Sequence, residues 1–167
     1  MTMKVLVISD THIPLAASSL PKVLVDEAKL SDCCLHCGDF VDYSVCETLS
    51  RLTKVYGVCG NMDEETVSKN LPQKQIIKLE EVTLGLIHGG GNPRNLISYI
   101  NNAFSREFAE IDIFVFGHSH KPEDLEIENK IYFNPGSVTD KVFAPYRSYG
   151  ILEINGTKIK RRIVKIG

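Results

Sequence analysis

The chain has 167 residues, 43% of them hydrophobic and 24% charged, with a formal net charge of -2. This balance is typical of one folded domain, residues 1–167, and argues against disorder. No apolar run approaches the roughly 18 to 20 residues that a bilayer crossing needs, so no membrane association is expected. Lysine and arginine gather only at residues 158–165, where they alternate with Ile and Val as on one solvated face of a strand. A dedicated nucleic-acid surface is therefore not predicted.

Residues 1–9 are apolar over about one strand and carry neither a basic leader nor a small-residue cleavage site, which predicts a cytoplasmic protein. The five cysteines are an odd number on apolar segments, as expected of reduced thiols. Cys34 and Cys37 have a spacing found in zinc sites, but no second pair lies at a suitable distance, so buried thiols are the preferred interpretation.

Segments rich in Val and Ile alternate with helix-compatible segments, which predicts an α/β fold. Residues 4–9 form a nearly continuous apolar strand, the pattern of a strand buried on both faces at the centre of a sheet. Residues 20–30 read as an amphipathic helix that Pro21 can open at its first turn. The next elements are a strand at 33–37, a helix at 44–52 and a strand at 54–59.

Further along, residues 75–79 and 82–87 form a predicted strand pair that turns at Glu80 and Glu81. A loop at 89–93, a helix at about 95–108 and a very apolar strand at 111–116 follow. From Leu125 onward short alternating strands are separated by turn signals at 128–130, 134–136 and 155–156. The last third is therefore expected to be mainly antiparallel.

Five polar clusters each follow one of the predicted strands. Ligand sites in open α/β sheets form beyond the carboxyl ends of strands, so these clusters should converge. Side chains two apart on an extended backbone point the same way, which would pair Asp10 with His12 and His118 with His120. The clusters are Asp10-Thr11-His12, Gly38-Asp39, Gly60-Asn61-Met62-Asp63, His88-Gly89 and Gly117-His118-Ser119-His120.

Four of the five histidines lie in these clusters. One histidine at a strand end is more often a hydrogen-bonded structural residue than a metal ligand, but four beside two aspartates and an asparagine favour a metal site. Nitrogen and oxygen ligands without thiolate suit Mn²⁺, Fe²⁺, Co²⁺, Ni²⁺ or Zn²⁺. His36 lies outside the strand-end positions and is interpreted as a packed histidine or one that supports a ligand.

The ordered series Asp-x-His, Gly-Asp, Gly-Asn-x-Asp, His-Gly and Gly-His-x-His resembles the calcineurin-like metallophosphoesterase superfamily. The short length and Asn134-Pro135-Gly136-Ser137 look like its compact YfcE-type phosphodiesterase branch. The resemblance implies two packed β-sheets flanked by helices, a four-layer sandwich. It also implies that one metal is held by Asp10, His12 and His120, a second by Asn61, His88 and His118, and that Asp39 bridges the two.

The resemblance further implies hydrolysis of a small or nucleotide-like phosphodiester through attack of a metal-bridging hydroxide. Two divalent ions, with Mn²⁺ the leading candidate, and two carboxylates would leave a net charge of about +2, which attracts an anionic ester. The catalytic residues would be Asp39, Asn61, His88 and His118. A phosphomonoesterase of the same chemistry is the nearest alternative, and a non-catalytic scaffold on the same fold is another.

Asp63 is either the acceptor that orients a ligating histidine, which by the resemblance is His12, or an aspartate that stabilises a turn. Relatives commonly carry histidine or cysteine where Met62 stands and histidine where Gly90 stands, so groups that could protonate a leaving oxygen are missing here. Candidate substrate contacts are Asn61, Gly90 and Arg94. Residues 89–91 are either a phosphate-facing backbone segment or a plain flexible loop. The expected partner is a small-molecule phosphate ester, and a homodimer stays open.

Overall fold

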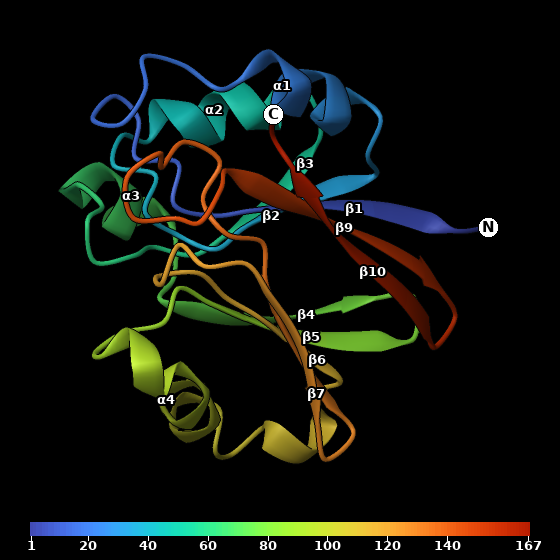
Figure 1. Cartoon of the computed structure of the whole chain (residues 1–167). Coiled ribbons are helices and arrows are strands. Elements are labelled where there is room, and N and C mark those ends of the chain that lie inside the picture. The colour runs from blue at the N-terminus through green and yellow to red at the C-terminus, as the bar shows by residue number, and fades with distance from the viewer.

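Two five-stranded sheets face each other in the computed structural model, which describes residues 1–167 (Figure 1). The first sheet has the order β10 (Lys158–Lys165), β9 (Ser148–Asn155), β1 (Met3–Ile8), β2 (Cys33–His36), β3 (Lys54–Gly57). The second has the order β4 (Lys74–Leu79), β5 (Val82–Ile87), β6 (Ile113–Val115), β8 (Lys130–Asn134), β7 (Glu123–Ile127).

Helices cover the outer face of each sheet, so the molecule has four layers. Helices α1 (Lys22–Lys29) and α2 (Ser44–Ser50) lie on the first sheet, and α4 (Leu96–Ala103) lies on the second (Figure 1). The predicted sandwich of two packed sheets flanked by helices is confirmed. No helix combines the length and the apolar character that a membrane crossing requires.

The core explains why β1 is apolar at nearly every position. Val5 and Val7 point between the sheets, where they join Leu84 and Leu86 of β5 in one apolar cluster. Leu6 and the alternate residues beside it point outward into a cluster with the buried faces of α1 and α2. β1 pairs in parallel with β2 and antiparallel with β9, so it is buried at the centre of its sheet as predicted.

The second half of the chain divides between the two sheets. The predicted β4–β5 pair is an antiparallel hairpin, and β7–β8 and β9–β10 are two more. β8 also pairs in parallel with β6, which completes the second sheet. In β10 the side chains alternate between exposed and partly buried, so Lys158, Lys160 and Arg162 lie on a solvated face, whereas Arg161 lies on the other face and pairs with Asp124 of β7.

One helical prediction needs correction, and one helix was not predicted. The helix expected at residues 95–108 is shorter: a 3₁₀ turn at Pro93–Asn95 precedes α4, which ends at Ala103, and a second 3₁₀ turn spans Phe108–Glu110. The polar stretch at 105–107 has no apolar face to bury, so nothing holds the helix together there. Helix α3 (Glu65–Asn70) has no counterpart in the sequence prediction, because its six residues bury only Val67.

Candidate metal centre

All five polar clusters lie at the carboxyl ends of strands, on one edge where the two sheets meet. Three follow β1, β2 and β3 of the first sheet, and two follow β5 and β6 of the second. Backbone hydrogen bonds tie neighbouring clusters together: Asp10 N–H donates to the Gly38 carbonyl at 3.0 Å, and Gly117 N–H donates to the His88 carbonyl at 3.0 Å. The donor side chains therefore start from a fixed scaffold.

The backbone of the first and last clusters is left-handed rather than extended, so the expected cause of the pairing of Asp10 with His12 and of His118 with His120 is wrong. Asp10, His12, His118 and His120 have φ values of 53°, 44°, 70° and 59°. The left-handed conformation is rare for residues with a Cβ and costs free energy at each position. The site thus concentrates strained residues where the donors are presented.

The first donor group consists of Asp10, His12 and His120. Asp10 Oδ1 lies 3.6 Å from His12 Nε2 and 3.3 Å from His120 Nε2. The other oxygen, Oδ2, accepts hydrogen bonds from the Ser9 hydroxyl and from the backbone N–H of His118. Oδ1 is left as the atom that faces the two imidazoles.

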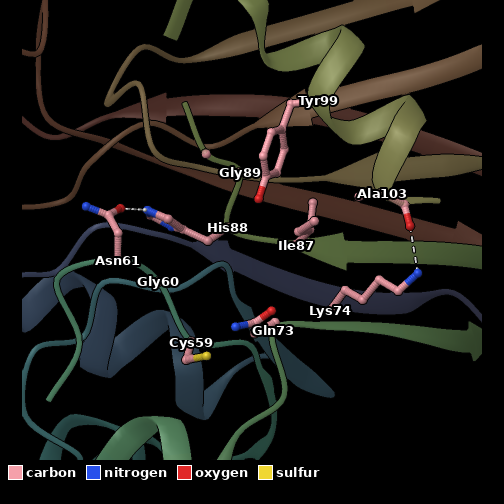
Figure 2. Close-up of a pocket in the computed structure, with 11 residues that line it drawn as sticks. Cys59, Gly60, Asn61, Gln73, Lys74, Ile87, His88, Gly89, Tyr99 and Ala103 are labelled. Carbon is pink, nitrogen blue, oxygen red and sulfur yellow. Dashed lines mark hydrogen bonds between the residues drawn. The ribbon is translucent and has the colours of Figure 1, made fainter. Parts of the chain in front are cut away.

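The second donor group consists of Asn61, His88 and His118. Asn61 Oδ1 lies 3.1 Å from His88 Nε2 and 3.2 Å from His118 Nδ1. Figure 2 shows the Asn61 amide and the His88 ring pointing at each other. The three donors belong to clusters that are far apart in sequence.

Asp39 lies between the two groups. Its Oδ2 is 3.4 Å from His12 Nε2 of the first group and 3.3 Å from His88 Nε2 of the second. Its Oδ1 accepts a hydrogen bond from the backbone N–H of Met62 at 2.9 Å, which fixes the carboxylate in this position. One oxygen of one residue therefore faces both groups.

The ring nitrogens that point away from the donor groups are fixed as hydrogen-bond donors. His88 Nδ1 donates to the Cys37 carbonyl at 2.7 Å, and His118 Nε2 donates to the Gly91 carbonyl at 2.9 Å. A carbonyl only accepts, so each of these nitrogens carries the proton and the opposite nitrogen keeps its lone pair for a cation. Once each ring is neutral, it is thus held in the tautomer that metal ligation requires.

The donor set fits divalent cations. Ligands bound at about 2.0 to 2.2 Å with tetrahedral or octahedral angles are about 3 to 3.5 Å apart, close to the donor separations described above. Asp10 Oδ1 and His12 Nε2 are buried side-chain atoms without a hydrogen-bond partner. Buried polar atoms are normally satisfied, so these two donors fit a bound cation as their partner. The groups Asp10, His12, His120 and Asp10, Asp39, His88 both meet the geometric requirement for holding a metal.

The charges of the site agree with this fit. Burial raises the pKa of the Asp10 carboxyl, but contacts with His12 and His120 outweigh it and keep that pKa well below its usual range. Burial lowers the pKa of His88, yet the Asp39 and Asp10 carboxylates outweigh it and raise the value to about 9. Protons therefore compete with a cation for the same nitrogens, so metal binding should strengthen as the pH rises.

The structure adds Asp140, which sequence reasoning missed. Its carboxylate accepts a hydrogen bond from Nδ1 of His120, leaving Nε2 to face Asp10. Burial lowers the pKa of His120, but Asp10 and Asp140 raise it to about 9. Asp140 lies 20 residues after His120 in a loop without regular structure, so no strand-end pattern marks it.

Replacing Asp140 with Asn should lower metal affinity by roughly 10- to 100-fold, because acceptors that orient ligating histidines have effects of this size. Competition between the protein and a chromophoric chelator measures the affinity. Asp26→Asn is the matched control, since Asp26 pairs with Lys22 on the surface of α1. Equal affinities in the two variants would show that Asp140 does not support His120.

Asp63 does not orient His12 in this structure. Its two oxygens accept backbone N–H groups of Val41 at 2.7 Å, of Gly60 at 2.6 Å and of Asp39 at 3.1 Å. The turn-stabilising alternative is the one that the contacts support. By holding the loop of Gly60 to the loop of Asp39, Asp63 still fixes where the second donor group lies.

His36 has no lone pair to spare for a cation. It is fully buried and stacks on Phe40, its Nδ1 accepts from the Gly38 N–H at 3.2 Å, and its Nε2 contacts the Thr11 hydroxyl at 3.1 Å. These contacts agree with the interpretation as a packed histidine that supports the loops of the site. Burial lowers the pKa of His36 from the ordinary 6.5 to about 3.

Acid should destabilise the protein through His36. The unfolded chain takes up a proton below pH 6.5 that the folded chain refuses until about pH 3, so stability is present above 6.5 and is lost as the pH falls through this window. Between pH 7 and pH 5 the loss from His36 alone should be about 2 kcal/mol, whereas in the chelated protein the raised pKa values of His88 and His120 act in the opposite direction. Urea unfolding of the chelated wild type and of His36→Gln isolates the His36 contribution as the difference between the two pH dependences. An unchanged slope in the variant would contradict a buried neutral His36.

The candidate substrate contacts have different outcomes. Gly90 lines a hollow of about 460 Å³ that also reaches Asn61 and His88 (Figure 2). Arg94 is exposed, its backbone N–H is bound by the Asn92 side chain, and it does not line this hollow. The structure thus brings Asn61 and Gly90 together and leaves Arg94 outside. Of the five cysteines, Cys59 borders this hollow and is partly exposed, and the other four are buried free thiols.

Comparison with known proteins agrees with this geometry. Residues 3–157 match the model of the calcineurin-like phosphoesterase superfamily domain. The chain is 36% identical over 143 residues to a probable metallophosphoesterase of Methanocaldococcus jannaschii, covering 83% of this chain and 69% of that protein. It is 33% identical over 162 residues to a probable metallophosphoesterase of Methanothermobacter thermautotrophicus, covering 96% and 91%.

Solved structures share the fold. Vps29 of Cryptosporidium parvum superposes with a TM-score of 0.83 at 24% identity, covering 99% of this chain and 92% of that one. Vps29 of Entamoeba histolytica complexed with zinc has a TM-score of 0.74 at 28% identity, covering 98% and 99%. The gathered donors support a metal-dependent phosphoesterase, and the chain belongs to the calcineurin-like phosphoesterase superfamily.

Proposed function

We propose that the protein is a dinuclear phosphodiesterase that hydrolyses a small or nucleotide-like phosphate ester. Asp10, His12 and His120 would hold one divalent ion, Asn61, His88 and His118 a second, and Asp39 would contact both. Mn²⁺ is our leading candidate, and Ni²⁺, Fe²⁺, Co²⁺ and Zn²⁺ suit the same donors.

The position of Asp39 carries the proposal. A carboxylate oxygen at 3.4 Å and 3.3 Å from histidines of two different donor groups is what a bridging ligand requires. A single ion would need only one of the two donor groups. The polar atoms of the other donor group would then be buried without a partner, which costs free energy of folding. The zinc reported for the Vps29 neighbour of Entamoeba histolytica supports metal binding on this fold.

The ions would supply Lewis acidity, which lowers the pKa of bound water and neutralises charge on phosphoryl oxygens. The chain's own residues hold the ester in place. Asn61 and His88 border the hollow beside the second donor group, so they would position the phosphate against it. The two carboxylates reduce the charge of two divalent ions to about +2, enough to attract an anionic diester.

A protein nucleophile is not needed, and the cysteines are poor candidates. Burial raises the pKa of the Cys59 thiol, the one that borders the hollow, so little thiolate is present near neutral pH. The same argument disfavours a thiol redox function. Because all five cysteines are free, we place the activity in a reducing compartment such as the cytoplasm.

Assays with aryl phosphate monoesters and diesters across several divalent ions test this function. Exhaustive chelation should remove activity, and added Mn²⁺ or Ni²⁺ should restore it, with diesters turned over faster than monoesters. Activity that survives chelation would reject a metal mechanism. Metal binding at two ions per chain without hydrolysis of any ester would instead indicate a scaffold on the same fold.

A further inference from the structure

Two hollows flank the donor residues, and each reaches one donor group. The first, of about 460 Å³, reaches Asn61 and His88 of the second group (Figure 2). The other, of about 480 Å³, reaches His12 and His120 of the first group. A phosphate held at the centre therefore has space for an organic group on either side. A monoester would use only one of these spaces.

The hollow beside His12 and His120 has an apolar side that faces water, and Thr139, Asp140 and Lys141 complete its lining. Leu15, Val142 and Phe143 line it and are 69%, 80% and 86% exposed. Three large apolar side chains around one opening are unfavourable in water, so they gain most if an apolar group of a ligand covers them. The opening lies beside His12 and His120, two proposed metal-binding residues. The molecule that covers the apolar side chains is therefore expected to be the ester itself.

The apolar wall is fixed to the metal centre through one residue. The backbone N–H groups of Val142, Phe143 and Ala144 donate to the carboxylate of Asp140 at 2.8, 3.0 and 3.1 Å. The same carboxylate accepts from Nδ1 of His120. The loop that carries Val142 and Phe143 is thus held by Asp140, the same residue that orients His120. This connection is expected of a substrate wall, which must keep its distance from the reacting phosphorus.

The hollow beside Asn61 and His88 has a different character. Tyr99 forms one wall, with its ring against the backbone of Gly90, where an added Cβ would lie 2.7 Å from the ring. The Gln73 side chain borders the same space (Figure 2). Lys74 is the charged residue there, and its Nζ binds the Ala103 carbonyl and lies 3.6 Å from Glu107. The space therefore offers an aromatic ring, an amide and a lysine whose charge is paired with Glu107. These groups suit a planar uncharged group rather than a second phosphate.

We propose that the substrate is a phosphodiester with unequal arms, one apolar arm between Leu15 and Phe143 and one planar, uncharged arm beside Tyr99. This inference rests on the proposed function and names its substrate class. It assigns Leu15, Phe143 and Tyr99 to specificity, because they contact the ester arms and lie outside the donor groups.

The apolar arm is tested with 4-nitrophenyl alkyl phosphates whose alkyl chain grows from methyl to hexyl. In the Mn²⁺-loaded wild type, kcat/KM should rise roughly tenfold along the series, as expected when about two methylenes leave water. Phe143→Ser and Leu15→Ser should each reduce the rise to about threefold or less. Ile127→Ser is the control, because Ile127 is an exposed apolar residue on β7 that does not line either hollow. It should keep the full rise.

The planar arm is tested with Tyr99. Tyr99→Ala should raise KM for the 4-nitrophenyl esters by roughly fivefold while the dependence on alkyl length stays intact, and Tyr99→Phe, which keeps the ring, should restore KM. A readout independent of turnover is calorimetric binding of methyl alkyl phosphinates, anionic diester analogues whose two P–C bonds are not hydrolysed. Their affinity should rise with chain length in the wild type and not in Phe143→Ser.

Each outcome separates the inference from the proposed function. Hydrolysis that is independent of chain length, or a rise that survives in both serine variants, would overturn the assignment of the apolar arm and leave a metal-dependent hydrolase. The same KM in Tyr99→Ala as in the wild type would overturn the planar arm. Failure to hydrolyse any ester in the presence of bound metal would overturn the proposed function and the inference with it.

Discussion

Replacing Asp39 with Ala should lower kcat/KM by roughly 1,000-fold or more and reduce the content of both metal ions. One oxygen of Asp39 faces both donor groups, so its loss removes a ligand from each ion and a negative charge from between them. The charge stabilisation that such a centre supplies is worth several kcal/mol, which sets the size of the expected effect. Steady-state kinetics and elemental analysis of the purified variant measure the two quantities.

Asp124→Ala is the matched control, because Asp124 pairs with Arg161 on the surface away from the donors. It should keep both ions and full turnover. Asp39→Asn tests the charge itself, since its amide oxygen can still accept the Met62 N–H. Wild-type turnover in Asp39→Ala with both ions in place would reject the bridging role.

Gly117→Ala should disable the site although it replaces no donor residue. A Cβ at this position would lie 1.9 Å from the Ser9 hydroxyl oxygen and 2.7 Å from Asp10 Oδ2, and both residues are completely buried. Neither can move aside without displacing Asp10 from the first donor group. We expect metal affinity and activity to fall by more than about 100-fold and the free energy of unfolding to drop by about 1 to 3 kcal/mol.

Two further variants show whether the expected loss in Gly117→Ala comes from its contacts with Ser9 and Asp10. Ser9→Gly combined with Gly117→Ala removes the closest contact and should recover part of the affinity. Gly156→Ala lies in the turn between β9 and β10, with φ of 58° and only Glu81 within 4 Å. It should cost about 1 kcal/mol of stability and leave metal binding unchanged. Wild-type metal affinity in Gly117→Ala would contradict the packing described for Asp10.

The donor residues could be found from the sequence because each follows a recognisable strand. An apolar run such as β1 ends abruptly at a polar residue, and parallel strands bring such ends to one edge. Their roles as metal ligands stay predictions until a metal is observed. Their backbone conformation was predicted wrongly, because left-handed φ values at Asp10 and His118 come from loop contacts with other strands and leave no local signal.

The contacts of the residues that support the donors could not be predicted from the sequence for a related reason. Asp140 meets His120 only because the loop after β8 folds back over the end of β6, and a lone aspartate in a loop has no periodic pattern. Asp63 could be selected as a supporting residue, but its choice of backbone N–H groups over an imidazole depends on how two loops approach each other. The short helix α3 was not predicted because it buries one side chain and therefore has no amphipathic period.

Anomalous diffraction from Mn²⁺-soaked crystals tests the central claim most directly. We expect two peaks about 3.5 to 4 Å apart, one among Asp10, His12 and His120 and the other among Asn61, His88 and His118, with Asp39 Oδ2 bound to both. One peak, or two peaks that do not share Asp39, would contradict the dinuclear centre on which the proposed chemistry depends.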